Sequence, residues 1–198
     1  MCGRFESKPN SEGLLKQLEQ LNIDLIVEKD NELKTVNIAP TEKITGIRKL
    51  EVKYLLSSYE WGIKFSNTSP LIFNSRIETI KEKQFWLDSF DMNRCLIPMS
   101  AFYEWRKEGS KKVPYRIFLK TEDLFFTPAL YYKNNENSYY ASLITTTPNE
   151  FIKPIHHRMQ VIFTYQNAVS FLTNTLDENL KLCIPFPNPE NMGMERVN

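Results

Sequence analysis

The first hydrophobic pattern in the chain has helical spacing. Four leucines between residues 14 and 21 fall on one face of a helix, and Ser11 stands where a serine can cap its first turn. The pattern predicts an amphipathic helix over residues 11–21 whose leucine face packs against the core.

From about Leu50 the hydrophobic residues occur in short runs, some of them alternating with polar residues, that are rich in aromatic and β-branched side chains. Such runs, separated by turn residues, are typical of strands. Gly109 and the lysines beside it fit the tip of a hairpin between Trp105 and Pro114. The predicted strands are residues 52–56, 94–97, 101–105, 115–119, 124–127, 139–145 and 161–165.

Helical spacing returns in two further segments, residues 83–90 and 167–172. Because the order is mostly strands with few long helices, we expect an α+β fold with a mainly antiparallel sheet rather than a parallel βαβ sheet. The 198 residues contain no linker, repeat or low-complexity tract. We therefore expect one domain over residues 1–198, with residues 185–198 as a C-terminal tail.

Composition and charge narrow the classes of function. The 25 Lys and Arg nearly balance the 24 Asp and Glu, so the net charge of +1 gives no long-range attraction to a polyanion, and any nucleic-acid site must be local. No run approaches the roughly 18 apolar residues that span a bilayer. We therefore expect a cytoplasmic protein with no membrane partner, and a monomer is the default expectation.

The three cysteines predict neither a disulfide framework nor a metal site. Cys2, Cys95 and Cys183 are widely spaced, with no second cysteine or histidine at ligand spacing. No cofactor motif is visible either. Cys95 lies inside an apolar run, where a cysteine usually behaves as a small hydrophobic residue, and we expect it and Cys183 to be inert.

The first chemical signal is Met1-Cys2-Gly3. Because aminopeptidases remove an initiator Met that precedes a small residue, the mature chain should begin with Cys2, which then carries a free amine and a thiol. An α-amino group with a pKa near ~8 and a thiol with a pKa near ~8.5 are both partly deprotonated close to neutrality. The amine can condense with an aldehyde to an imine, and the thiol can close on that carbon to form a thiazolidine. A small second residue is also common for processing reasons alone.

A series of short motifs follows in a fixed order along the chain. They are Met1-Cys2-Gly3-Arg4-Phe5, Asn37-Ile38-Ala39-Pro40-Thr41, Trp61-Gly62, Phe73-Asn74-Ser75-Arg76-Ile77-Glu78-Thr79, Arg94-Cys95-Leu96-Ile97-Pro98, Phe102-Tyr103-Glu104-Trp105, Pro114-Tyr115 and Ile155-His156-His157-Arg158-Met159. This order resembles the SRAP family, the SOS-response-associated peptidase-like proteins that protect abasic sites in single-stranded DNA. The resemblance runs from Cys2 to about Phe163.

The resemblance implies the SRAP fold, with a barrel-like core and a few flanking helices, and a covalent reaction with DNA. Cys2 would attack the ring-opened aldehyde of an abasic deoxyribose in single-stranded DNA and form a stable thiazolidine crosslink that shields the lesion. It also implies a minor β-lyase activity from the same imine, and removal of Met1 by an autoproteolytic, peptidase-like step.

The resemblance assigns three further catalytic residues by motif position. Glu104, with its pKa raised by apolar surroundings, would supply the proton that opens the sugar ring. His156 would shuttle protons, and Asn74 would hold the opened sugar's hydroxyl or orient the Cys2 amine. From the residues alone, Glu104 could instead face solvent from a half-buried strand, and His156 could be structural. In an extended segment only one of His156 and His157 can face the site, and His157 departs from the family's pattern.

The resemblance also assigns a set of DNA-binding residues. The arginines would contact phosphate oxygens, a proline and a tryptophan would contact bases, and two threonine hydroxyls would donate to phosphate. They are Arg4, Pro40, Trp61, Arg76, Thr145, Thr146 and Arg158. Each arginine could instead be an ordinary solvated charge.

The segment after Trp61 departs from the family. The family commonly continues Trp-Gly-Leu-Ile-Pro with a second tryptophan, whereas Trp61-Gly62 is followed here by Ile63-Lys64-Phe65. Trp61 is also equally compatible with a core position. The departure puts base stacking at this place in doubt and leaves the crosslinking residues unaffected.

Two other classes of function stay open. A cysteine peptidase would use Cys2 as nucleophile, His156 as base and Glu104 or Asn74 to orient the base, and it would need an oxyanion hole that the sequence does not locate. A non-catalytic module for single-stranded DNA would keep the three arginines and tolerate Cys2→Ala.

Overall fold

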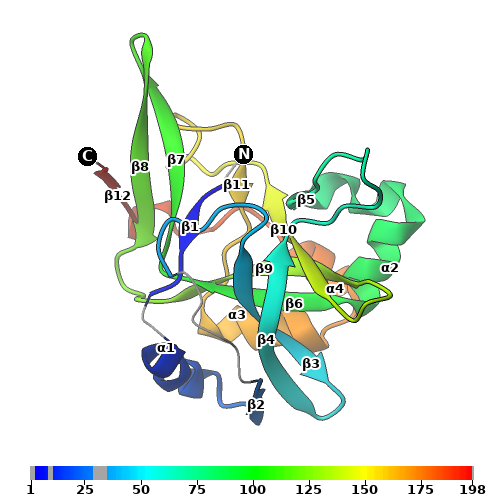
Figure 1. Cartoon of the computed structure of the whole chain (residues 1–198). Coiled ribbons are helices and arrows are strands. Elements are labelled where there is room, and N and C mark those ends of the chain that lie inside the picture. The colour runs from blue at the N-terminus through cyan, green and yellow to red at the C-terminus, as the bar shows by residue number, and fades with distance from the viewer. Residues whose placement is uncertain (1–2, 9–10, 29–34, 198) are drawn as a thin grey trace.

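The computed structural model describes residues 3–8, 11–28 and 35–197 (Figure 1). The strands are β1 (Phe5–Glu6), β2 (Leu25–Val27), β3 (Lys43–Leu50), β4 (Lys53–Trp61), β5 (Asn74–Arg76), β6 (Arg94–Met99), β7 (Ala101–Glu108), β8 (Lys111–Leu119), β9 (Phe125–Lys133), β10 (Tyr139–Thr146), β11 (Met159–Gln160) and β12 (Met192–Arg196). The helices are α1 (Ser11–Leu18), α2 (Gln84–Met92), α3 (Tyr165–Thr173) and α4 (Leu176–Leu182), with the short 3-10 helices η1 (Glu19–Leu21), η2 (Ile77–Glu82) and η3 (Pro189–Asn191).

The larger sheet closes on itself. Its strands run in the order β10-β9-β6-β3-β4, and β4 pairs back onto β10 through Glu60 with Tyr140 and Trp61 with Ala141. The pairs around this ring are antiparallel except for β4 with β10, and the short strands β2 and β5 add parallel pairs at its edges. The predicted α+β fold with a mainly antiparallel sheet is confirmed.

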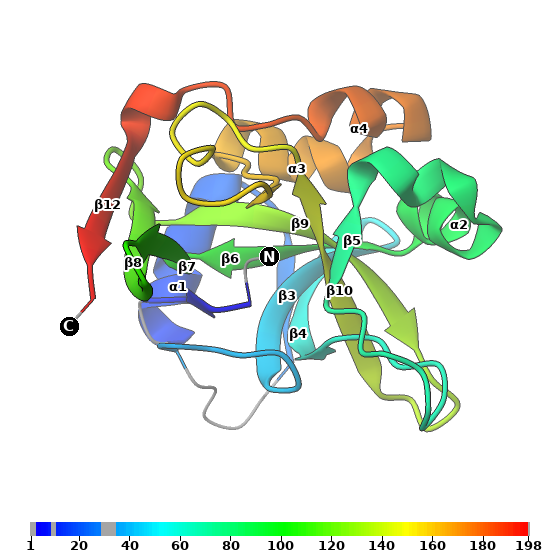
Figure 2. The same cartoon turned by 90° about the horizontal axis from the view of Figure 1, so that it is seen from above.

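A smaller sheet has the order β1-β7-β8-β12 and packs beside the ring (Figure 2). Strands β7 and β8 form a long hairpin in which Glu108 pairs with Lys111 across a two-residue turn. Gly109 has a φ of +60° at the first turn position, where a type II′ turn needs a positive φ that glycine adopts without strain. The hairpin predicted around Gly109 is confirmed.

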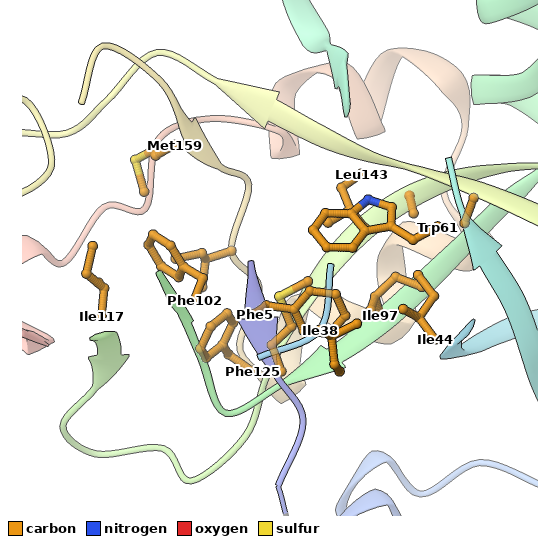
Figure 3. Close-up of a cluster of buried hydrophobic side chains, with 14 of the residues drawn as sticks. Phe5, Ile38, Ile44, Trp61, Ile97, Phe102, Ile117, Phe125, Leu143 and Met159 are labelled. Atoms are coloured by element: carbon orange, nitrogen blue, oxygen red, sulfur yellow. The ribbon is translucent and has the colours of Figure 1, made fainter. Parts of the chain in front are cut away.

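The hydrophobic core lies on both sides of the ring of strands. Cys95 and Ile97 of β6 belong to one cluster, which Figure 3 shows around Trp61 and Phe102, and Leu96 belongs to a second cluster beneath the helices. Because successive side chains of a strand point to opposite faces, β6 is buried on both sides and reads as a continuous apolar run. Each large apolar side chain buried in this way contributes roughly 1.5 to 3 kcal/mol.

The helices predicted from periodicity are confirmed. Helix α1 and η1 cover residues 11–21, and Leu14, Leu18 and Leu21 are buried. The segments 83–90 and 167–172 correspond to α2 and α3. Within the described part of the chain, none of the helices has the length and hydrophobicity to cross a bilayer.

Two predictions at the C-terminal side are wrong. Residues 161–165 form no strand, because Val161 and Phe163 are buried in an extended connection, where Phe163 makes a single bridge to Phe126, and α3 begins directly afterwards. Residues 185–197 are not a free tail, because Phe186 and Met192 are buried and β12 pairs with β8 over five residues. Helix α4 and the strands β1, β2, β3, β5, β11 and β12 were not predicted, since their runs are short or interrupted by charges.

Candidate active site

Strand β7 turns Glu104 toward the interior. Phe102 and Glu104 are buried, whereas Tyr103 is half-buried and Trp105 is exposed, as the alternation of a strand requires. Phe102 belongs to the cluster in Figure 3, so Glu104 shares the face that points to this apolar core, with only 3% of its surface exposed. The alternative of a solvent-facing Glu104 is therefore excluded.

His156 lies next to Glu104. Its Nδ1 is 4.0 Å from Oε1 of Glu104. The main chain of Arg158 holds the ring, because both its N–H nitrogen and its carbonyl oxygen lie 3.1 Å from Nδ1. The ring of His157 packs on that of His156 with centroids 4.3 Å apart and is itself exposed. The structure thus places His156, and not His157, beside the buried carboxyl group.

The two groups have shifted pKa values with the same cause. Burial raises the pKa of Glu104 to about 7 and lowers the pKa of His156 from its ordinary value, since desolvation disfavours the charged form of each. Oε1 of Glu104 has no hydrogen-bond partner among the described residues. Near neutrality the pair therefore combines an acid that keeps much of its proton with a neutral imidazole that can accept one. The raised pKa predicted for Glu104 is confirmed.

The described start of the chain runs along the strand that carries Glu104. The N–H of Tyr103 donates to the carbonyl of Arg4 at 2.9 Å, and Phe5 is in register with Phe102. Cys2, the predicted nucleophile, lies outside the described residues. It is joined to Gly3 by one peptide bond, which links Cα atoms about 3.8 Å apart.

A buried carboxylate that the sequence analysis missed anchors this start. Glu6 is 1% exposed and accepts hydrogen bonds from the hydroxyls of Tyr103 at 2.8 Å and Ser100 at 3.1 Å, and from Nε of Arg116 at 2.9 Å. Burial acts to raise the pKa of Glu6, but these bonds outweigh it and hold the pKa below its ordinary value. The sequence indicates the contact between Tyr103 and Glu6 only indirectly, because the alternation of side chains along β7 puts Tyr103 on the face opposite Glu104.

Strand β5 places Asn74 and Arg76 on one face, as predicted from their spacing. Asn74 is half-buried and Arg76 is exposed, while Ser75 between them is buried with its hydroxyl oxygen 2.8 Å from that of Ser142. Asn74 and Arg76 line a hollow that extends to Trp86 of α2. An exposed guanidinium at the rim of a hollow is suited to bind a phosphate from outside.

Arg158, in contrast, is engaged inside the protein. Its Nη1 and Nη2 donate to the two carboxylate oxygens of Glu78 at 2.7 and 2.9 Å, and Nη2 also donates to Oγ1 of Thr145 at 3.1 Å. Burial acts to raise the pKa of Glu78, but the hydrogen bonds from Arg158 outweigh it and keep that pKa low. Arg158, Thr145 and Thr146 are 8%, 1% and 3% exposed. In this arrangement Arg158 holds η2 against β10, and the phosphate contacts predicted for the three residues stay predictions.

Trp61 is a core residue and not a stacking surface. It is fully buried, its Nε1 donates to the carbonyl of Phe73 at 2.9 Å, and its ring packs edge-on against Phe5. The predicted base contact of Trp61 is therefore corrected. Pro40 and Arg4 are half-buried, and Nη1 of Arg4 donates to Oδ1 of Asn37 at 2.9 Å.

The described residues contain no cluster of three or more His, Cys, Asp or Glu side chains that could hold a metal ion. Cys95 and Cys183 are buried, and burial raises the pKa of both thiols well above the ordinary value, so neither is a thiolate at neutral pH.

The fold and the site define a class of α+β protein in which a closed ring of strands and a second sheet hold a buried Glu–His pair beside the start of the chain. The chain belongs to the family described as SOS response associated peptidase (SRAP), whose family model matches residues 1–198. The resemblance stated from the motifs is confirmed.

Two curated relatives show the range of similarity. The chain is 34% identical over 199 residues to the "Abasic site processing protein YoaM" of Bacillus subtilis (strain 168), which covers 94% of this chain and 86% of that protein. It is 24% identical over 174 residues to the "Abasic site processing protein YedK" of Escherichia coli (strain K12). This match covers 85% of this chain and 78% of that protein.

Solved structures share the fold. A protein from Bacteroides thetaiotaomicron has a TM-score of 0.71 at 25% identity over 82% of this chain and 78% of that chain. A protein from Bordetella bronchiseptica has a TM-score of 0.79 at 18% identity over 100% of both chains.

Proposed function

We propose that this chain processes abasic sites by binding single-stranded DNA that carries one and forming a thiazolidine between Cys2 and the ring-opened deoxyribose. The observation that carries the proposal is Glu104, a buried acid with a pKa of about 7, 4.0 Å from His156, on the strand that pairs with the start of the chain. The names of the curated relatives, abasic site processing proteins, support it.

Ring opening is the step that needs a buried acid. An abasic deoxyribose is mostly a closed hemiacetal with no free aldehyde. Protonated Glu104 donates its proton to the ring oxygen while the anomeric hydroxyl loses its proton to neutral His156, and the ring C–O bond breaks to give an aldehyde and a free hydroxyl. A carboxyl group with a pKa near the working pH is well suited to this transfer, because it is protonated often enough and still a good acid.

The ring then closes on Cys2. After Met1 is removed, the amine of Cys2 attacks the aldehyde carbon and water leaves, which gives an imine. The thiol sulfur adds to the imine carbon and its proton passes to the nitrogen, which completes a five-membered ring without any oxidant or reductant. Asn74 binds the freed hydroxyl, and Arg76 binds a phosphate beside the lesion. Loss of a proton from the sugar at the imine stage would instead cleave the strand, as a minor lyase reaction.

The test is intact mass and denaturing-gel analysis of the purified protein mixed with a single-stranded oligonucleotide that carries one abasic site. We expect an adduct with the mass of the Met1-free chain plus the oligonucleotide less one water, stable to heat without borohydride reduction. Cys2→Ala should give none. Cys2→Ser should give no stable adduct, because a hydroxyl closes poorly on the imine, yet should bind the same DNA without crosslinking.

Two controls complete the experiment. The undamaged oligonucleotide should bind without an adduct, and a chain that retains Met1 should not react, because its cysteine has no free amine. The proposal fails if wild-type protein with confirmed loss of Met1 forms no adduct. Cleavage of a protein substrate that depends on Cys2 would then favour the peptidase, and DNA binding that persists in Cys2→Ala would favour a simple binding module.

A further inference from the structure

The hairpin of β7 and β8 projects beyond the rest of the molecule (Figure 1). It continues the strand that carries Glu104, and its tip around Gly109 lies at the far end from α1 and from the turn between β3 and β4. Residues 105–112 include four basic side chains and one acid, a local charge of +3 in a chain whose net charge is only +1. Positive charge is thus concentrated on the most protruding element.

One face of the hairpin carries an unfavourable pair of like charges. Lys107 lies directly opposite Lys112, and Trp105 lies opposite Pro114 on the same face. Both lysines and Trp105 are exposed, with 39% of Trp105 accessible. Like charges directly opposite each other on two strands destabilise the pairing. Neither lysine makes an ion pair or a side-chain hydrogen bond within the described residues.

The acid of this segment does not neutralise the pair. Glu108 lies on the opposite face of β7, where its carboxylate accepts a hydrogen bond from the hydroxyl of Tyr115. The paired ammonium groups of Lys107 and Lys112 therefore face outward together, beside an exposed indole. A phosphate placed between them would turn their repulsion into attraction, and a base could stack on the indole.

We propose that the face formed by Trp105, Lys107, Lys112 and Pro114, hereafter the hairpin face, binds single-stranded DNA that flanks the abasic site. The proposal rests on the proposed function, because it takes the lesion to lie at Glu104. Lys107 is three residues beyond Glu104, which corresponds to roughly 10 Å along a strand. Because Lys107 and Trp105 lie on the face of β7 opposite Glu104, DNA that leaves the lesion reaches them around the edge of β7, where the lysines bind a phosphate of one flank and Trp105 stacks on a base of that flank.

The test compares K107Q/K112Q with K16Q/K49Q, a pair that removes the same charge from exposed positions at the opposite end of the molecule. Binding of an undamaged single-stranded oligonucleotide is measured by fluorescence anisotropy at several salt concentrations. For K107Q/K112Q we expect several-fold weaker binding and a slope of log affinity against log salt that is smaller by about 0.7, since the two lysines share one phosphate and each phosphate contact to a single strand contributes about 0.7. K16Q/K49Q should match wild type.

Oligonucleotides with the abasic site at one end identify the flank. Wild type should bind an oligonucleotide that lacks one flank more weakly than one that has both flanks. K107Q/K112Q should bind the two oligonucleotides with nearly equal affinity, because its contact with that flank is already lost. W105A should weaken binding about five-fold, at the low end for one stacked base, and W105F should restore most of it. Folding is not at risk in the lysine variant, because removal of the like-charge pair should leave the melting temperature unchanged or higher.

The proposal is overturned if K107Q/K112Q keeps the wild-type salt slope, or if its loss equals that of K16Q/K49Q. This outcome is distinct from failure of the proposed function. Crosslinking at saturating DNA depends on Cys2 and should proceed to wild-type yield in K107Q/K112Q. If wild type forms no adduct, the proposed crosslinking fails. The salt slopes of the variants still show whether the hairpin face binds single-stranded DNA.

Discussion

The carboxylate of Glu6 and the guanidinium of Arg116 form an ion pair that reaches from β1 across β7 to β8. Glu6 is 1% exposed, and Arg116 also pairs with Glu195 of β12, so all four strands of the smaller sheet are tied together. Gly3 is only three residues before Glu6. The pair therefore sets the direction in which the start of the chain passes Glu104.

Glu6→Gln should lower the free energy of unfolding by about 2 kcal/mol at pH 7. Breaking a buried pair usually costs more than this, but Arg116 keeps a quarter of its side chain exposed and can be partly solvated. Urea denaturation measures the change. Glu136→Gln, at an exposed position, is the matched control and should change stability by less than about 0.5 kcal/mol.

The effect of Glu6→Gln should depend on pH. The folded-state pKa of Glu6 lies below its ordinary value, so its contribution to stability is present above that ordinary value and is lost as pH falls through the folded pKa. The difference between wild type and Glu6→Gln should therefore shrink in acid. An equal difference at pH 3 and pH 7 would contradict the role of the ionised carboxylate.

The contribution of Glu104 to stability should depend on pH in the opposite direction to that of Glu6. The folded-state pKa of Glu104, about 7, lies above its unfolded value, so the folded state binds more protons between these two values and stability falls as pH rises through this window. Raising the pH from 5 to 8 should therefore destabilise wild type by about 2 kcal/mol relative to Glu104→Gln, which has no charge to bury. Parallel stability curves for the two proteins would show that Glu104 ionises normally.

The same residue gives a prediction for the reaction rate. If protonated Glu104 opens the sugar, adduct formation by wild type should slow as pH rises above about 7. Glu104→Gln should cost at least ten-fold in rate at pH 6 and less at pH 8, where wild type has already lost the proton. Single-turnover crosslinking at the two pH values measures this, and a rate that is unchanged by the substitution at both removes Glu104 from the mechanism.

Arg76 and Arg158 should behave differently when altered. Arg76 is exposed, so Arg76→Gln should weaken binding to single-stranded DNA and reduce the salt slope by about 0.7, with little effect on stability. Arg158→Gln should destabilise the fold by about 1 to 2 kcal/mol, because it leaves Thr145 without its buried partner while Glu78, with 40% of its side chain exposed, can be solvated. Its salt slope should stay at the wild-type value, provided the measurement is made where the variant is folded.

A double-mutant cycle checks the pairing of Arg158. Combining Arg158→Gln with Glu78→Gln should destabilise by clearly less than the sum of the two single changes, with a coupling of about 1 kcal/mol or more. Additive effects would show that the two side chains act independently.

Trp61→Phe should reduce stability by about 1 to 2 kcal/mol and leave DNA affinity unchanged. The smaller ring loses the hydrogen bond to the carbonyl of Phe73 and part of the contact with Phe5. Thermal unfolding and anisotropy measure the two effects. A loss of DNA affinity in a folded Trp61→Phe protein would restore the base-stacking role that its burial argues against.

Local periodicity determined much of what could be read from the sequence. The leucine spacing of α1, the two-residue turn at Gly109 and the alternation that turns Glu104 away from Trp105 are properties of neighbouring residues, and each has its expected place. The motif order also identified the family. These features depend on the chain's own geometry over a few residues, so they need no knowledge of distant contacts.

Tertiary packing decided the rest. Three features depend on which segments meet in space. Trp61 faces the core, Arg158 pairs with Glu78, which is 80 residues away, and the last strand pairs with β8. An isolated arginine or tryptophan has the same pattern in either role. The register of the strands and the packing of the core select one of the two roles, because a buried charge or indole N–H must have a hydrogen-bond partner within the fold.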